Sequence, residues 1–125
     1  MEISLTDREA DVMRVLWEYG PSVVSEVKNH LDDDLAYTTV LTILRTLESK
    51  GYAHHQEEGR THRYFAAVQK QVAQKSALRH LTNKLFGGST ELLFTHLVAE
   101  QKLSPKQLER LRKVLATKQK ENDHG

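Results

Sequence analysis

The chain has 125 residues, of which 38% are hydrophobic and 28% are charged, a composition typical of a soluble folded domain and not of a disordered or fibrous protein. It contains no cysteine, which excludes disulfide bonds and thiolate metal sites and is compatible with a cytoplasmic location. No apolar run is long enough to cross a bilayer and no signal-peptide pattern is present, so we expect no direct membrane insertion.

The formal net charge of +1 hides an uneven distribution of charged side chains. Residues 1–35 carry three basic and nine acidic side chains, residues 36–65 carry four and three, and residues 66–125 carry eleven and five. The surface is therefore not uniformly basic. Any nucleic-acid binding has to depend on shape, on a few placed contacts and on doubling of the site in a dimer.

Capping and turn residues mark the first elements. A Thr-x-x-Glu capping box predicts a helix over 6–19, and Gly20 and Pro21 end it. Ser22 is expected to begin a second short helix. The three aspartates at 32–34 then form a turn, and a solvated turn is favoured over a metal site because adjacent carboxylates point in different directions.

The stretch 35–51 predicts a helix with two different faces. At 100° per residue its apolar side chains cluster on one side. The other side and its flanks carry Thr38, Thr39, Leu41, Thr42, Arg45, Thr46 and Ser49. Threonine is a poor helix former, so a purely structural outer face would favour Glu, Lys, Gln or Ala. Threonine can instead contact bases or phosphates, and arginine can pair with guanine, which favours a helix lying in the DNA major groove. The alternative is an exposed helix with an accidental threonine bias.

Two short strands at about 53–57 and 61–66 predict a β-hairpin that turns at 58–59. A hairpin directly after such a helix is typical of the wing of a winged helix-turn-helix. Arg60 and Arg63 can reach phosphate or the minor groove from this wing. The alternative is an ordinary amphipathic hairpin.

Three of the seven histidines, His54, His55 and His62, lie on the predicted wing. Adjacent strand residues point to opposite faces, so His54 and His55 cannot both join His62 easily. We therefore expect these side chains to contact phosphate or solvent, and we assign no metal and no cofactor to the chain.

From about residue 69 the pattern is helical again, with breaks at 87–88 and at 104–105 that separate three short helices. Three short helices cannot bury this many leucines well by themselves. The leucines in question are Leu78, Leu81, Leu85, Leu92, Leu93, Leu97, Leu108, Leu111 and Leu115. We predict a dimerisation region over 69–120, whose apolar faces a second copy completes, and a flexible tail at 121–125. The alternative is that these helices pack back on the N-terminal domain of the same chain.

The most specific segments of the chain are Ala-Tyr-Thr-Thr-Val at 36–40 and Phe-Gly-Gly-Ser at 86–89. With these and other short matches over nearly its whole length, the chain resembles the penicillinase-repressor family, bacterial regulators of the BlaI, MecI and CopY types. The resemblance implies a winged-helix homodimer that binds an inverted-repeat operator and blocks transcription. It also implies base and backbone contacts at Thr38, Thr39, Leu41, Thr42 and Thr46, whereas Arg45 comes from the angular argument.

Two departures from the family bear on how the protein is controlled. Copper-responsive members carry a C-terminal cysteine cluster, and this chain has no cysteine. Penicillin-responsive members are cut in the dimerisation region when a membrane-bound sensor protease is activated. The corresponding stretch here, 94–96, does not carry the Asn-Phe pair of those members.

The sequence thus predicts a mainly α fold with a small β-hairpin: a winged helix-turn-helix domain over 1–68, followed by a three-helix dimerisation arm. We expect a homodimeric repressor that binds a double-stranded DNA operator and is released by an inducing signal such as proteolysis of the arm. No glycine-rich phosphate loop, HExxH motif or nucleophile elbow is present, so an enzyme is not expected. The alternative is a winged-helix protein-interaction module without DNA binding.

Overall fold

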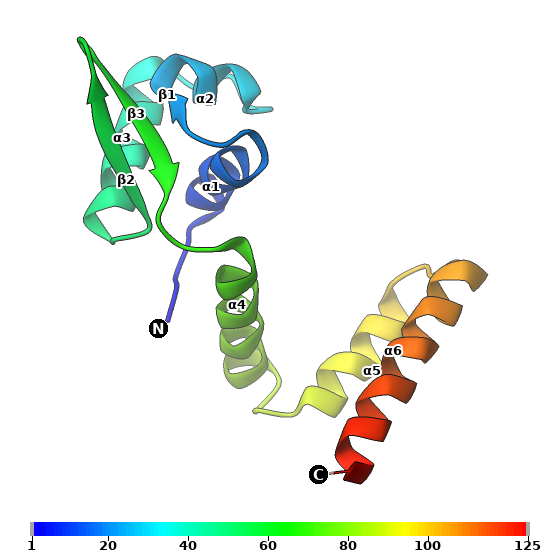
Figure 1. Cartoon of the computed structure of the whole chain (residues 1–125). Helices are drawn as coiled ribbons and strands as arrows, with labels where there is room; N and C mark the ends of the chain where they lie inside the picture. Colours follow the sequence, from blue (N-terminus) through cyan, green and yellow to red (C-terminus); the bar gives the residue numbers. More distant parts are fainter. Residues whose placement is uncertain (1, 125) are drawn as a thin grey trace. The chain divides into compact units, whose positions relative to one another are not determined.

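The structure is a computed structural model that describes residues 2–124 (Figure 1). The helices are α1 (Asp7–Tyr19), α2 (Val24–His30), α3 (Tyr37–Ser49), α4 (Lys70–Leu85), α5 (Thr90–Glu100) and α6 (Pro105–His124). The strands are β1 (Ser22–Val23), β2 (Ala53–Glu58) and β3 (Thr61–Ala66), which form one antiparallel sheet in the order β1-β3-β2. This mainly helical fold with a small sheet confirms the predicted fold class.

The predicted capping box starts α1. The Thr6 hydroxyl accepts a hydrogen bond from the Glu9 N–H at 3.2 Å, and the Glu9 carboxylate accepts one from the Thr6 N–H at 2.8 Å. At the other end the Gly20 N–H donates to the Leu16 carbonyl at 3.0 Å with φ of 81°, a conformation that favours glycine. The local signals in the sequence therefore fix both ends of this helix.

The prediction that Ser22 begins a helix is wrong. Ser22 and Val23 form the short strand β1, opposite Tyr64 and Arg63 of β3, and α2 begins only at Val24. The Ser22 hydroxyl donates to the Gly20 carbonyl at 2.9 Å, so it does not cap the helix. A two-residue strand has no periodicity for sequence reasoning to detect, which is why β1 was not predicted.

Strands β2 and β3 form the predicted hairpin, with His55 opposite Tyr64 in the register. The strand β2 continues to Glu58, and the turn falls at Gly59 and Arg60, one residue later than predicted. Gly59 has φ of 65°, so glycine sets the position of this turn.

Residues up to His80 form one compact unit, and residues from Leu81 onward form another. The core of the first unit is supplied mainly by α1, α2, α3 and the hairpin, which lies alongside α3 (Figure 1). Its most deeply buried side chains are Val12, Met13, Val15, Val27, Val40, Leu44, Leu47 and Tyr64.

The first unit extends beyond the predicted domain boundary at 68. Ala73 of α4 is buried in its core, and the Ser76 hydroxyl accepts a hydrogen bond from the Ile3 N–H at 2.7 Å. The Trp17 indole also donates to the Val68 carbonyl at 2.9 Å. The beginning of α4 therefore belongs structurally with the winged helix, through contacts between residues far apart in sequence.

In the second unit, Ser89 caps α5 through the Leu92 N–H at 3.0 Å. Ser104 and Gln107 form a reciprocal capping box at the start of α6, with hydrogen bonds of 2.8 and 3.1 Å. The helix α6 runs to His124, so residues 121–124, which the sequence assigned to a flexible tail, are helical, and Gly125 lies outside the described residues. Within the described part of the chain, no helix is both long and apolar enough to span a membrane.

A buried ion pair joins the start of α1 to the end of α3. The Lys50 ammonium lies 2.8 Å from the Glu9 carboxylate, whose side chain is almost fully buried. Burial by itself raises the pKa of Glu9, but the hydrogen bond from Lys50 and the N–H of Thr6 more than offset this and leave it below its ordinary value. Folding therefore gains stability from the ionised form of Glu9.

We predict that Lys50→Met lowers the free energy of unfolding by roughly 1–3 kcal/mol at neutral pH, because a buried carboxylate loses its cation. Since the folded-state pKa of Glu9 is lowered, its contribution is complete above the ordinary carboxyl pKa of about 4.3 and is lost as the pH falls through the folded-state value. Urea titrations of the wild-type chain and of Lys50→Met at pH 7 and pH 3 measure this difference in the free energy of unfolding. The control is Lys75→Met on the exposed side of α4. A deficit of equal size at both pH values would contradict the role given to the ion pair.

Candidate nucleic-acid interface

One face of the helix α3 is buried in the core, and the other face is exposed to solvent. Val40, Leu44 and Leu47 are completely buried. The exposed side carries the predicted site residues Thr38, Thr39, Thr42, Arg45 and Thr46, with Leu41 half-buried at its edge. Tyr37 is half-exposed, because it is the first helical residue and precedes the buried Val40 by one turn.

The hydroxyls of two of these threonines, Thr42 and Thr46, are held by the helix itself. The Thr42 hydroxyl donates to the Thr38 carbonyl, and the Thr46 hydroxyl donates to the Thr42 carbonyl, both at 2.9 Å. Each hydroxyl uses its proton inside the helix and keeps its oxygen lone pairs and the neighbouring methyl group for contacts outside. The face thus presents hydrogen-bond acceptors and methyl groups in fixed rotamers, which suits base amino groups and the thymine methyl.

Glu48, the acid of α3, is turned toward the hairpin. Its two carboxylate oxygens lie 2.7 and 2.8 Å from Nδ1 of His55, and one of them also accepts the His55 N–H at 3.2 Å. Nearby, burial first and then the charge of Glu48 raise the pKa of Tyr64, whereas the guanidinium of Arg45 works against this rise. The negative charge of α3 is therefore engaged at the base of the wing, away from the threonines.

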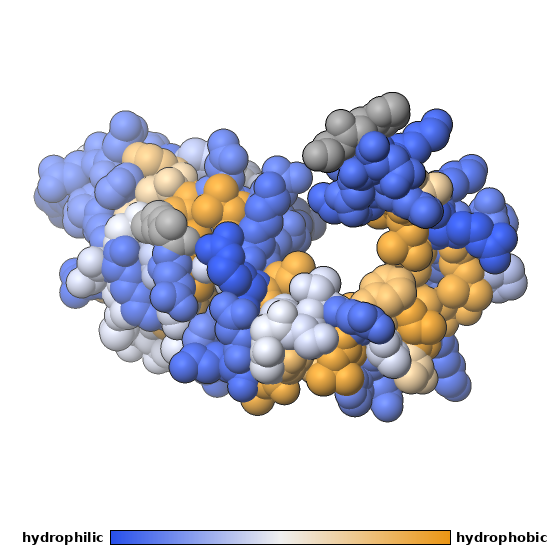
Figure 2. Space-filling model, turned by 90° about the horizontal axis from the view of Figure 1, so that it is seen from below, coloured by the Kyte–Doolittle hydropathy of each residue, from blue (hydrophilic) through white to orange (hydrophobic). Residues whose placement is uncertain are grey.

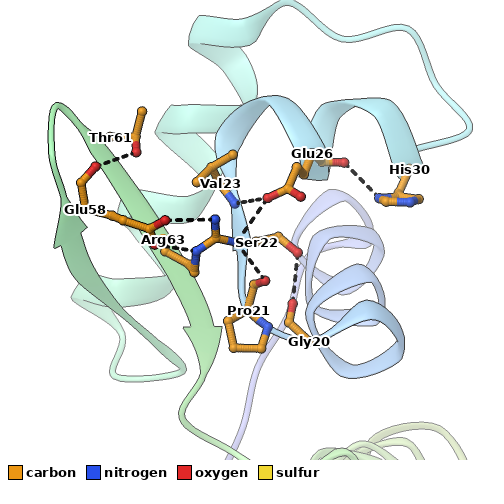
Figure 3. Close-up of polar contacts among 9 residues, drawn as sticks. All are labelled: Gly20, Pro21, Ser22, Val23, Glu26, His30, Glu58, Thr61 and Arg63. Carbon is orange, nitrogen blue, oxygen red and sulfur yellow. Dashed lines mark hydrogen bonds and ion pairs between the residues drawn. The ribbon is translucent and has the colours of Figure 1, made fainter.

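Arg63 was predicted as a phosphate contact, but the structure gives its guanidinium internal partners (Figure 3). Its Nε donates to the Glu58 carboxylate at 2.6 Å. Its Nη1 donates to the Pro21 carbonyl and to the Glu26 carboxylate, both at 3.2 Å. The hydrogen bond from Arg63 also holds the pKa of Glu58 below its ordinary value. Arg63 thus ties the wing to β1 and α2, a function that a face pattern alone does not reveal.

Arg60 lies in the turn at the tip of the wing and is exposed. It forms no ion pair within the part of the chain that the structure describes. Of the two arginines predicted for the wing, Arg60 is therefore the one whose charge is available to a phosphate.

A helix with a buried apolar face and an exposed threonine face, followed directly by a hairpin, is the arrangement expected of a winged-helix DNA reader. The sequence pattern of the family described as penicillinase repressor matches residues 5–117. The chain belongs to the penicillinase repressor family. Membership supports a DNA-binding repressor and places the chain among transcriptional regulators, not enzymes.

Individual penicillinase repressor relatives are distant but match most of the chain. The methicillin resistance regulatory protein MecI of Staphylococcus aureus strain N315 is 22% identical over 118 residues, which cover 91% of this chain and 94% of MecI. The penicillinase repressor of Bacillus licheniformis is 23% identical over 113 residues, covering 89% and 88%. A transcriptional regulator from Thermotoga maritima shares the fold, with a TM-score of 0.54, 15% identity and coverage of 96% of this chain and 80% of that one.

The C-terminal helices of this penicillinase repressor-family chain expose much apolar surface, seen in orange on the right of Figure 2 where α5 and α6 lie. The nine leucines predicted for dimerisation are all exposed except Leu93, which is 6% exposed and already buried within one chain. The residues predicted for dimerisation did not include Phe94, Val98 and Val114, which are also exposed and lie on α5 and α6. Their helical spacing from the chosen leucines was the signal that could have found them.

The two wing arginines should behave differently when they are replaced. Arg60→Ala should weaken binding to all duplexes alike and lower the slope of log affinity against log salt by about one, because one phosphate contact is lost. Arg63→Ala should instead lower the melting temperature, because the link between the wing, β1 and α2 is broken. Fluorescence anisotropy over a salt series and thermal unfolding of each variant measure the two effects. A full unit of slope lost in Arg63→Ala, with unchanged melting, would reverse this assignment.

Proposed function

We propose that the protein is a cytoplasmic homodimeric repressor that binds an inverted-repeat operator in double-stranded DNA. The observation that carries this proposal is the exposed face of α3, where four threonines and Arg45 lie on a helix whose other face is buried. Family membership supports the general class, and the geometry of this face supports its use on DNA.

In this proposal the α3 side chains Thr38, Thr39, Leu41, Thr42, Arg45 and Thr46 read the major groove. Arg45 pairs with a guanine or a phosphate, and the threonines and Leu41 contact base edges and thymine methyl groups. Arg60 adds a phosphate contact that does not depend on sequence. The near-neutral charge of residues 36–65 means that such a module binds weakly when it is single, so two linked copies are needed.

The alternative is a winged-helix module that binds another protein through the same helix. Interfaces between proteins are enriched in aromatic side chains, methionine and arginine at their centres. Apart from Arg45, and Tyr37 at its first position, the outer face of α3 is instead made mainly of threonines. This composition favours DNA over a protein partner.

Specific operator binding follows from the α3 face. With operator fragments recovered by sequencing the genomic DNA that the protein retains, Arg45→Ala should weaken operator binding by about 1–3 kcal/mol. Thr42→Ala should relax the choice of base in each half-site, and the two half-sites should lie about one helical turn, roughly 10 bp, apart. The control is Lys75→Ala, which removes one positive charge from α4. Equal affinity for operator and scrambled duplex at physiological salt would refute the proposal of specific operator binding.

We further propose that the exposed leucines of α4, α5 and α6 join two chains into the operator-binding dimer. Linking two winged helices makes binding of the second half-site intramolecular, which raises avidity by ~10²–10⁴ without new DNA contacts. Proteolysis between Ser89 and Glu100, for example by a membrane-bound sensor protease, would split α5 and release the operator. The control by copper through a cysteine cluster has no counterpart in this chain, which lacks cysteine.

A charge placed in the dimer interface should separate the chains. Leu97 is 46% exposed on α5, and we expect Leu97→Glu to produce monomers and to weaken operator binding at least a hundredfold, since avidity is lost. Ala116→Glu adds the same charge on the polar side of α6, where its helical neighbours are Arg112, Lys113, Gln119 and Lys120, and serves as the matched control. Sedimentation velocity and operator titration on the full chain measure both effects. A dimeric Leu97→Glu chain with undiminished affinity would show that this face does not hold the dimer.

A further inference from the structure

Three potential metal ligands converge on one face of the wing. His55 and Glu57 of β2 and His62 of β3 lie on the same side of the hairpin, because Glu57 is opposite His62 in the register and His55 is two residues away. One ligand atom from each of these three side chains lies within 4.8 Å of the others. His54 points to the other face, where its ring lies 5.9 Å from that of Phe65.

The contact with Glu48 sets the chemical state of His55. A carboxylate has no proton to donate, so Nδ1 of His55 carries the hydrogen that lies between it and the two oxygens of Glu48 at 2.7 and 2.8 Å. In the neutral ring Nε2 then has a free lone pair, which is the form that binds a metal ion. A carboxylate that orients a histidine in this way commonly supports a ligand histidine in zinc sites.

The other two ligands have room to adjust. The His62 and Glu57 side chains are 39% and 78% exposed, and their nearest charged atoms are 4.0 Å apart. The rings of His55 and His62 are stacked, with centroids 4.2 Å apart and planes inclined by 11°. Stacking keeps the in-plane lone pairs of the two rings in nearly parallel planes, so His62 has to rotate toward the ion while Glu48 holds His55. A tetrahedral ion with bonds of about 2.0–2.1 Å needs ligand atoms roughly 3.4 Å apart, a closure that exposed side chains permit.

We infer that His55, Glu57 and His62 form a site for a divalent transition-metal ion of the Zn²⁺ class on the wing, with Glu48 of α3 orienting His55. Two imidazoles and one carboxylate, without thiolate, are a ligand set for Zn²⁺, and three protein ligands leave one position open. Within the described residues this is the group of histidine and acidic side chains that meets the geometry of a three-ligand site.

Occupation of this site changes the charge next to the DNA-reading helix. The ion adds two positive charges to a face that carries Glu57 and, at its base, Glu48. Its open position can accept a phosphate oxygen. If the wing lies on DNA, as the proposed function requires, the gain of one phosphate contact at about 0.1 M salt raises duplex affinity roughly tenfold. The ion would then act as a co-repressor.

The test titrates the tag-free full chain, freed of metal with a chelator, with Co²⁺ followed by visible absorption and then with Zn²⁺ in a calorimeter. We expect one high-affinity ion per chain and the intense visible bands of a tetrahedral Co²⁺ site. His55→Ala and His62→Ala should each weaken Zn²⁺ binding at least tenfold, and Glu48→Gln should weaken it about 10–100-fold. The matched control is His54→Ala, whose side chain lies on the opposite face and whose Zn²⁺ affinity should be unchanged. Circular dichroism without metal verifies that each variant is folded.

Equal Zn²⁺ affinity of the wild-type chain and the folded His62→Ala variant would overturn the site. Anisotropy titrations of a duplex with and without Zn²⁺ then test its effect, which should be lost in His62→Ala and kept in His54→Ala. Zinc binding that leaves duplex affinity unchanged overturns the co-repressor role. A chain that binds no duplex under either condition refutes the proposed function, while the metal titration still decides the site.

Discussion

Complete burial of the inner face of α3 is the constraint on which the proposed DNA-reading surface depends. Four threonines make this helix intrinsically weak, since each loses side-chain freedom against the preceding turn. Val40, Leu44 and Leu47 are fully buried against the core and supply the stabilisation that the outer face does not. The outer side chains are therefore not needed to stabilise the helix, and their identity can be set by what they contact.

The ion pair of Lys50 with Glu9 and the hydrogen bond between His55 and Glu48 lie at the edges of this surface. Lys50 is bound to Glu9 at the end of the helix, and Glu48 is bound to His55 beside the hairpin. Glu9 and Glu48 are thus occupied by internal partners and repel a phosphate backbone less than free carboxylates would. The first contact joins the end of α3 to α1, and the second joins α3 to the wing.

Sequence reasoning found what is periodic or local and missed what is short or distant. The capping box of α1 and the two faces of α3 were predicted because their signals repeat within a few residues. The strand β1 was missed because two residues carry no period, and the domain boundary was placed at 68 because the bond between Ile3 and Ser76 joins residues 73 positions apart. For Arg63, the position on the hairpin was predicted, but the sequence could not show that its guanidinium contacts Glu58, Glu26 and Pro21.

The two faces of the wing carry residues with different roles. On one face Arg63 joins β3 to Pro21 and Glu26, so that face is closed by contacts within the chain. On the other face His55 and His62 are only partly covered, Glu48 of α3 holds His55, and both rings contact the buried Tyr64. A strand alternates its side chains strictly, so the residue that anchors the hairpin cannot also point toward this open face. Arg63 therefore anchors the hairpin from one face, while the proposed metal ligands lie on the other face, where Glu48 of α3 holds His55.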